Sequence, residues 1–168
     1  MARDLTRRRS WSSDVAVTPF QRFLDEQRDA VWRFLVAAVG RQDADDLFQE
    51  TFLAAMRAYP RTTIDNPRAW ALTIAHRKAL DHHRARARRP VPVAAVPDAG
   101  ALDGHAVLEE PTWEAVRALP PKQRACVLLR YAGDLAHAEV AAALGISEEA
   151  ARRNVSDGLR RLRGEVER

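Results

Sequence analysis

The segment 90–112 limits what this chain can fold into more than any other feature of its sequence. It contains six residues that interrupt helices and disfavour continuous sheet: Pro90, Pro92, Pro97, Gly100, Gly104 and Pro111. It also has four acidic residues and no basic one, namely Asp98, Asp103, Glu109 and Glu110. We therefore expect a flexible acidic linker between a unit at 18–89 and a unit at 113–168, with a basic tail at 1–17. A single domain with a long surface loop is the alternative, but such loops are uncommon in compact domains.

Both flanking units are predicted to be helical, because their apolar residues recur every three or four positions and no strand-like alternation occurs. Thr18-Pro19 and Asn66-Pro67 each pair a capping residue with a proline, as at a helix start, while Gly40 and Pro60 mark helix ends. The expected helices are 19–39, 43–59 and 67–89 in the first unit, and 113–119, 121–133, 138–144 and a long one from 148 in the second. The predicted fold class is all-α, with two small helical domains.

The second expected helix carries an acidic face beside its apolar stripe. The stripe consists of Phe48, Phe52, Ala55, Met56 and Tyr59, and the polar face consists of Asp45, Asp46, Gln49 and Glu50. Carboxylates repel DNA phosphates, so this face suits a positively charged protein partner. The alternative is that these side chains serve solubility and compensate the helix dipole.

The last two helices follow the pattern of a helix-turn-helix. Gly145 permits the turn, Ile146 is expected to fill the core, and Ser147 is expected to cap the final helix. That helix has a predicted buried stripe of Ala151, Val155, Leu159, Leu162 and Val166. Its opposite face presents Arg152, Arg153, Asn154, Ser156, Arg160 and Arg161. Arginine can read guanine and asparagine can read adenine in the major groove, which favours DNA binding over an ordinary solvated face.

A second basic cluster follows Trp70 on the third expected helix. Its members are Arg77, Lys78, Arg84, Arg86, Arg88 and Arg89. This number of cations exceeds what a helix end requires, so contact with nucleic acid is the better interpretation. Trp70 could stack on an unpaired base, although core packing is the more common role of a single tryptophan.

The composition argues against several other classes of protein. One cysteine among 168 residues excludes a disulfide framework, and no apolar run is long enough to cross a bilayer, so a soluble cytoplasmic protein is expected. His76, His82 and His83 do not form a metal-binding pattern, and Cys126 lies in an apolar run where it should pack as a small hydrophobe. We expect no catalysis, no metal and no cofactor.

Four ordered motifs resemble the extracytoplasmic-function (ECF) group of the sigma-70 family of RNA polymerase sigma factors. They are DADDLFQETFLAAMRAY at 43–59, NPRAWALTIA at 66–75, LPPKQR at 119–124 and EVAAALGIS at 139–147. The resemblance covers about residues 19–89 and 117–163. It implies a region 2 and a region 4 without a region 3 between them.

The resemblance also implies partners and site residues. Asp45, Asp46, Gln49 and Glu50 match the region 2.2 helix that binds the β′ clamp helices of core RNA polymerase. The −10 promoter element is implied to meet Asn66, Arg68, Trp70, Arg77, Lys78 and Arg84. The −35 element is implied to meet Ser147, Arg152, Arg153, Asn154, Ser156 and Arg160. Further implied contacts are the polymerase β flap for region 4, the RNA exit path for the acidic linker, an anti-sigma protein as inhibitor, and the nucleoid during initiation.

Two departures from the family pattern fall where bases would be selected. His76-Arg77 stands where Arg-Asn is common, and Arg152-Arg153-Asn154 stands where Lys-Ser-Arg is frequent. The promoter sequence therefore does not transfer from relatives. A stand-alone helix-turn-helix regulator that acts without polymerase is the alternative function, but it needs neither the acidic second helix nor the basic third one.

Overall fold

The structure is a computed structural model that describes residues 19–88 and 110–166. The elements run α1 (Pro19–Val39), α2 (Arg41–Ala58), η1 (Tyr59–Arg61), α3 (Pro67–Arg88), α4 (Glu110–Ala118), α5 (Pro121–Val127), η2 (Leu128–Ala132), α6 (His137–Leu144) and α7 (Glu148–Val166). Within these two ranges every regular element is helical, which confirms the all-α prediction. The basic tail at 1–17 and most of the expected linker, 90–109, lie outside the described residues.

Local signals in the sequence determine the helix ends. The Asn66 side chain accepts a hydrogen bond from the Ala69 amide at 2.9 Å, and the Ser147 hydroxyl accepts one from the Ala150 amide at 3.1 Å, so two of the three predicted N-caps are formed. The third, Thr18, lies outside the described residues. Gly145 ends α6 with φ +65°, a left-handed conformation that glycine adopts without strain. α4 begins at Glu110, earlier than the expected 113. The expected helix over 121–133 changes to one π-helical turn, η2, after Val127.

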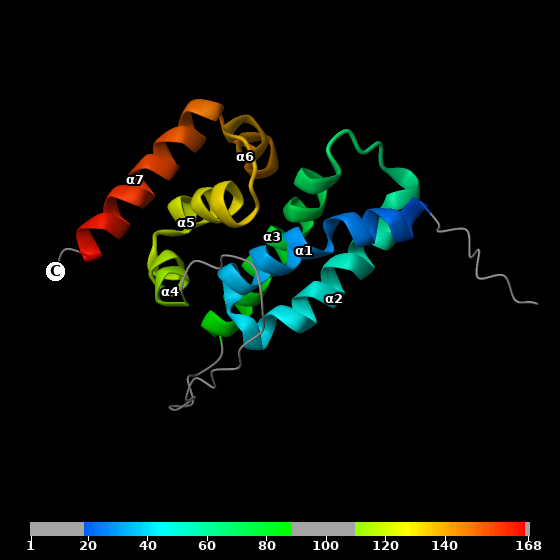
Figure 1. Ribbon diagram of the computed structural model, residues 1–168, viewed down its shortest axis with the longest axis horizontal. Helices are drawn as coiled ribbons and strands as arrows, with labels where there is room; N and C mark the ends of the chain where they lie inside the picture. The colour runs from blue at the N-terminus through cyan, green and yellow to red at the C-terminus, as the bar shows by residue number, and fades with distance from the viewer. Residues whose placement is uncertain (1–18, 89–109, 167–168) are drawn as a thin grey trace, which may run out of the picture.

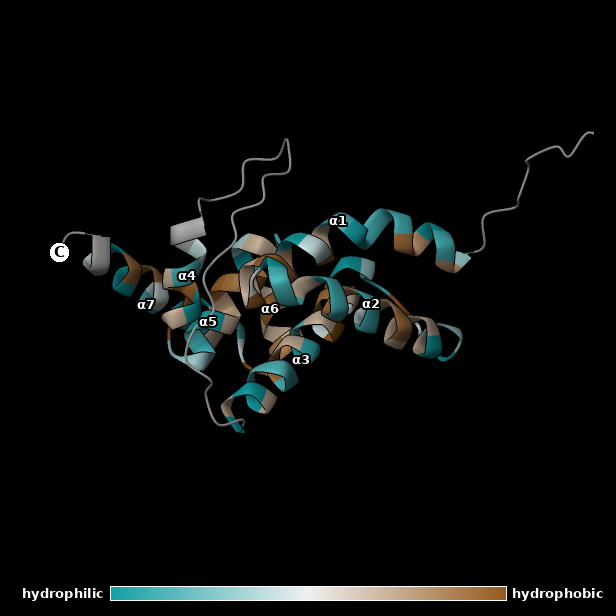
Figure 2. Ribbon diagram, turned by 90° about the horizontal axis from the view of Figure 1, so that it is seen from below, coloured by the Kyte–Doolittle hydropathy of each residue, from teal (hydrophilic) through white to brown (hydrophobic). Residues whose placement is uncertain are grey.

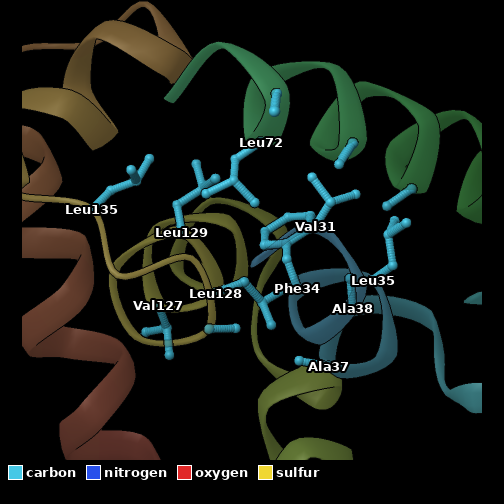
Figure 3. Close-up of a cluster of buried hydrophobic side chains, with 14 of the residues drawn as sticks. Val31, Phe34, Leu35, Ala37, Ala38, Leu72, Val127, Leu128, Leu129 and Leu135 are labelled. Carbon is cyan, nitrogen blue, oxygen red and sulfur yellow. The ribbon is translucent and has the colours of Figure 1, made fainter. Parts of the chain in front are cut away.

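The first unit, α1–α3, and the second unit, α4–α7, lie side by side and share one hydrophobic core. Figure 1 shows α1, α2 and α3 in one bundle, with α5 and α6 against it and α7 along the outer edge, far from α2. Figure 3 shows how Val31 and Phe34 of α1, Leu72 of α3 and Leu128 of η2 point into a common cluster. Two tethered, separately packed modules were expected, so this continuous core is a structural finding that the sequence did not predict.

The hydropathy of the ribbon follows this packing. In Figure 2 hydrophobic residues gather where the helices meet, and the projecting end of α3 is hydrophilic. Cys126 is fully buried, as predicted, and burial raises the pKa of its thiol to about 11. Among the described helices none combines the length and the apolar character needed to cross a membrane.

Candidate nucleic-acid interface

The four predicted polar residues of α2 form an exposed surface, which we call the acidic face: Asp45, Asp46, Gln49 and Glu50. Glu50 pairs with Lys78 of α3 at 3.1 Å, and both side chains remain partly exposed. Asp43, two residues before Asp45, points toward α3 instead. Its carboxylate accepts a hydrogen bond from His82 at 3.2 Å and one from Arg86 at 2.8 Å. Asp43 therefore joins α2 to α3.

Met56 was expected in the buried stripe of α2, and this prediction is wrong because its exposure is 49%. The buried face is rotated toward Ala44, Leu47 and Thr51. Thr51 can be buried because its hydroxyl donates to the Leu47 carbonyl at 2.7 Å, so no polar atom is left unpaired. Leu53 and Met56 consequently lie exposed on α2, beyond Glu50 toward the end of the helix. They extend the acidic face with apolar side chains, a feature that was not predicted from the sequence.

The predicted residues of α3 divide into two groups along the helix. Arg77 and Arg84 are exposed, and Arg84 pairs within its own helix with Asp81 at 3.6 Å. Asn66 and Arg68, at the start of α3, contact the second unit: the Asn66 amide donates to Glu139 of α6, and Arg68 pairs with Asp134 at 3.1 Å. Arg89 lies outside the described residues.

Trp70 packs in an aromatic cluster of the first unit. Its ring lies edge-on to Phe23, with centroids 5.3 Å apart, and 6.4 Å from the ring of Tyr59. The residue remains partly exposed. The core-packing alternative therefore accounts for the position of Trp70, and stacking on a base stays a prediction.

The outward surface of α7, which we call the basic face, carries Arg152, Arg153, Ser156 and Arg160, all exposed. Each arginine already has a carboxylate partner on its own helix. The pairs are Arg152–Glu148, Arg153–Glu149 at 3.1 Å and Arg160–Asp157 at 3.2 Å. Asn154 is half-buried and donates to the Ala150 carbonyl at 2.8 Å. Of the predicted reading residues on this face, the arginines and Ser156 are exposed, whereas Asn154 is half-buried and bonded to the backbone of its own helix.

Arginines of the second unit hold the end of α1. Arg117 of α4 donates to the Ala37 carbonyl at 3.2 Å, in the last turn of α1, where backbone carbonyls lack helical partners and the dipole is negative. Arg124 of α5 donates to the Arg117 carbonyl at 2.8 Å. No motif indicated these roles, because each depends on a contact distant in sequence.

A small cavity of about 30 Å³ lies where α1, α3 and α5 meet, and His76, His83 and Arg124 line it. Burial, then the positive charges of Arg124 and Arg77, lowers the pKa of His76 from its ordinary 6.5. Folding therefore favours the neutral form of His76 over the charged form.

His83 shares this environment. Burial and then the charge of Arg124 lower the pKa of His83, and the charges of His82 and Arg86 lower it further. The hydrogen bond between its Nε2 and the Ala38 carbonyl, 3.1 Å long, acts in the opposite direction.

Acidification below pH 6.5 is expected to destabilise the chain, because both histidines bind protons more readily when unfolded. The contribution of these groups to stability is fully present above the unfolded pKa and is lost as pH falls through the lower folded values. Melting temperatures at pH 7.5 and 5.5 measure this loss. The variant His76→Gln/His83→Gln should show a smaller decrease than His137→Gln, which lies outside the cavity; equal decreases would contradict the assignment.

Comparison with known proteins places this geometry in a family. The Sigma-70 region 2 family matches residues 23–89, and the Sigma-70, region 4 family matches residues 110–162. The ECF RNA polymerase sigma factor BldN of Streptomyces coelicolor is 35% identical over 142 residues, which are 78% of this chain and 54% of that protein. The ECF RNA polymerase sigma factor SigD of Mycobacterium tuberculosis is 35% identical over 161 residues, covering 85% of this chain and 74% of that protein.

Solved structures show the same fold at lower sequence identity. The sigma factor RpoE from Bartonella quintana, solved in complex with the anti-sigma factor NepR, superposes with a TM-score of 0.75 at 23% identity, covering 88% of this chain and 96% of that one. CnrH, solved with the cytosolic domain of CnrY, gives a TM-score of 0.64 at 20% identity, covering 88% of this chain and 87% of that one. From the matched regions and relatives together, the chain belongs to the ECF group of the sigma-70 family of RNA polymerase sigma factors.

Proposed function

We propose that this chain directs core RNA polymerase to promoters, as regions 2 and 4 of its family imply. In this proposal residues 18–89 form region 2, 90–112 the linker and 113–168 region 4. Two surfaces of opposite charge support it. The acidic face of α2 and the basic face of α7 are both exposed, on different units, and Figure 1 places their helices far apart.

The acidic face is assigned to core polymerase, at the β′ clamp helices. Its carboxylates are unsuited to DNA, and the neighbouring Leu53 and Met56 are 47% and 49% exposed. Exposed apolar side chains beside charge are typical of a protein-binding surface. Region 4 is assigned to the β flap by family membership alone.

The DNA contacts are divided between the two units. The −10 element is assigned to α3 through Asn66, Arg68, Trp70, Arg77, Lys78 and Arg84. The −35 element is assigned to α7 through Ser147, Arg152, Arg153, Asn154, Ser156 and Arg160. An exposed arginine row on the second helix of a helix-turn-helix is suited to the major groove.

Transcription in vitro tests the proposal as a whole. Purified chain is added to core polymerase with a library of promoter fragments, and defined transcripts that require both proteins are expected. Tight binding to duplex DNA by the chain alone, with no transcripts when core is added, would instead favour a stand-alone regulator. Because the structural relative RpoE was solved with the anti-sigma factor NepR, co-purification from the native host is expected to yield an inhibitory protein.

Replacing Arg153 by alanine is expected to change −35 preference by about 1–3 kcal/mol at one base pair, the cost of one lost base contact. The substitution also leaves Glu149, its partner at 3.1 Å, unpaired near DNA. Competitive transcription from promoters that differ at single −35 positions measures the change. Arg163→Ala, nearer the end of α7, is the control; an equal loss across all sequences would identify Arg153 as a phosphate contact.

A further inference from the structure

The cavity where α1, α3 and α5 meet is lined by one positive charge, two histidines and apolar side chains. Its polar lining residues are His76, His83 and Arg124, and among the described residues no aspartate or glutamate lines it. We propose that this cavity binds a small monovalent anion, such as chloride, between Arg124 of α5 and His76 of α3.

Arg124 carries a positive charge that no carboxylate of the described residues neutralises. Its Nη1 donates to the Arg117 carbonyl at 2.8 Å, and it forms no ion pair within residues 19–88 and 110–166. Burial lowers the pKa of the guanidinium, because the surrounding protein replaces part of its hydration. Withdrawing a charge from water is costly unless an opposite charge lies beside it. An anion in the cavity would supply that opposite charge.

The charged groups that act on His76 are positive as well. Burial has the largest effect on its pKa, and the charges of Arg124 and Arg77 lower the pKa further. The carboxylate of Asp43, on α2, is already paired with two side chains of α3. The cavity therefore lies in a positive potential, which attracts an anion and repels a cation.

The hydrogen-bond donors at the cavity suit an anion. An arginine side chain has five N–H donors and no acceptor, and Arg124 uses Nη1 for the Arg117 carbonyl, so donors remain. His76 has no hydrogen-bond partner among the described residues, so the N–H of its neutral ring is a second donor. His83 differs, because its Nε2 lies 3.1 Å from the Ala38 carbonyl, and it serves as part of the wall. An anion only accepts hydrogen bonds, as these donors require.

The size of the cavity limits the anion to a small one. Its volume is about 30 Å³. A water molecule needs about 10–15 Å³ of such space, so a single monatomic anion fits, whereas a phosphate group is too large. Apart from the three polar side chains, the lining residues are apolar, and low polarity strengthens the attraction between Arg124 and a bound anion. The expected ligand is therefore a halide ion.

Thermal unfolding in two sodium salts tests the proposal. The full-length chain is melted in sodium chloride and in sodium gluconate, each at about 200 mM, so that charge screening is equal and only the anion differs. A ligand at about ten times its Kd raises the folding equilibrium constant about tenfold. For 168 residues this should raise the melting temperature in chloride by about 3–5 °C. Equal melting temperatures in the two salts would overturn the proposal.

Two variants locate the effect within the chain. Arg124→Gln removes the positive charge, and Ala79→Val fills the cavity from a position 3% exposed while every charge is kept. In each variant the rise in chloride should fall below about 1 °C. The rise compares two salts for one protein, so a general loss of stability in the variant does not affect it. Arg57→Gln removes a charge from the exposed surface of α2 and should keep the full rise. A full rise in Ala79→Val would overturn the site.

Chlorine NMR measures binding without unfolding the protein. Exchange of chloride between solution and a protein site broadens the chloride resonance, and the wild-type chain should broaden it more than Ala79→Val does. Circular dichroism confirms that the variant is helical. Equal broadening by the two proteins would show that chloride contacts only surface arginines, which would overturn the cavity site. Neither measurement involves DNA or polymerase, so the result is independent of the proposed function.

Discussion

Replacing Phe34 by alanine is expected to lower the free energy of unfolding by about 3–5 kcal/mol, the cost of truncating a buried aromatic side chain. Phe34 is fully buried, and its ring lies 6.4 Å from that of His76. In Figure 3 it points from α1 toward Leu128 of η2, so its removal leaves a cavity between the two units. The free energy of unfolding of a native protein is only about 5–15 kcal/mol, so this substitution removes a large fraction of the stability.

Urea denaturation followed by circular dichroism and tryptophan fluorescence measures this effect. Because one core serves both units, Trp70 of α3 and Trp113 of α4 should report a single, earlier transition. Leu53→Ala, at a position 47% exposed, is the control and should change stability by less than about 1 kcal/mol. An early transition of the first unit, with the second unit unchanged, would contradict the shared core.

Reversing two charges on the acidic face is expected to weaken binding to core polymerase by about 30-fold or more. In Asp46→Lys/Glu50→Lys, attraction to a positive partner becomes repulsion, which costs on the order of 2 kcal/mol or more. Both residues are exposed, and the Glu50–Lys78 pair that is lost lies at the surface, so folding should be nearly unaffected. Affinity is measured by titrating labelled chain with core polymerase, and helicity by circular dichroism.

Asp25→Lys/Asp29→Lys is the matched control, because it reverses the same charge on the exposed surface of α1. It should keep near wild-type affinity if the acidic face is the docking surface. Equal losses of affinity in the two variants would show that net charge controls association. An unchanged affinity in Asp46→Lys/Glu50→Lys would contradict the assignment of the acidic face to core polymerase.

Features encoded by neighbouring residues were predictable from the sequence. The N-caps at Asn66 and Ser147 and the turn at Gly145 each depend on a few adjacent positions, and the structure confirms all three. The exposure of the acidic face and of the arginines of α7 also followed, since helical spacing separates them from the buried stripes. Met56 was misassigned because the spacing of apolar residues shows that a helix has a buried face, but does not show where the neighbouring helices leave the edge of that face uncovered.

Features that need long-range contact were not predictable. Asn66 and Glu139 are 73 residues apart in the sequence. Water could satisfy the hydrogen-bonding groups of both side chains, so neither residue by itself indicates the other as its partner. Nothing local indicates that Arg117 will cap α1 or that Asp43 will join α2 to α3. The shared core is likewise hidden, because each unit alone shows an ordinary amphipathic pattern.

The ion pairs within α7 bear on how the chain would respond to ionic strength. Arg152, Arg153 and Arg160 each have a carboxylate one turn away as an internal counterion. A phosphate that approaches such an arginine replaces the protein carboxylate as its partner, rather than replacing only ions bound from the salt solution. Fewer small ions are then released per contact, so the logarithmic dependence of affinity on salt concentration is shallower than a count of these arginines would give.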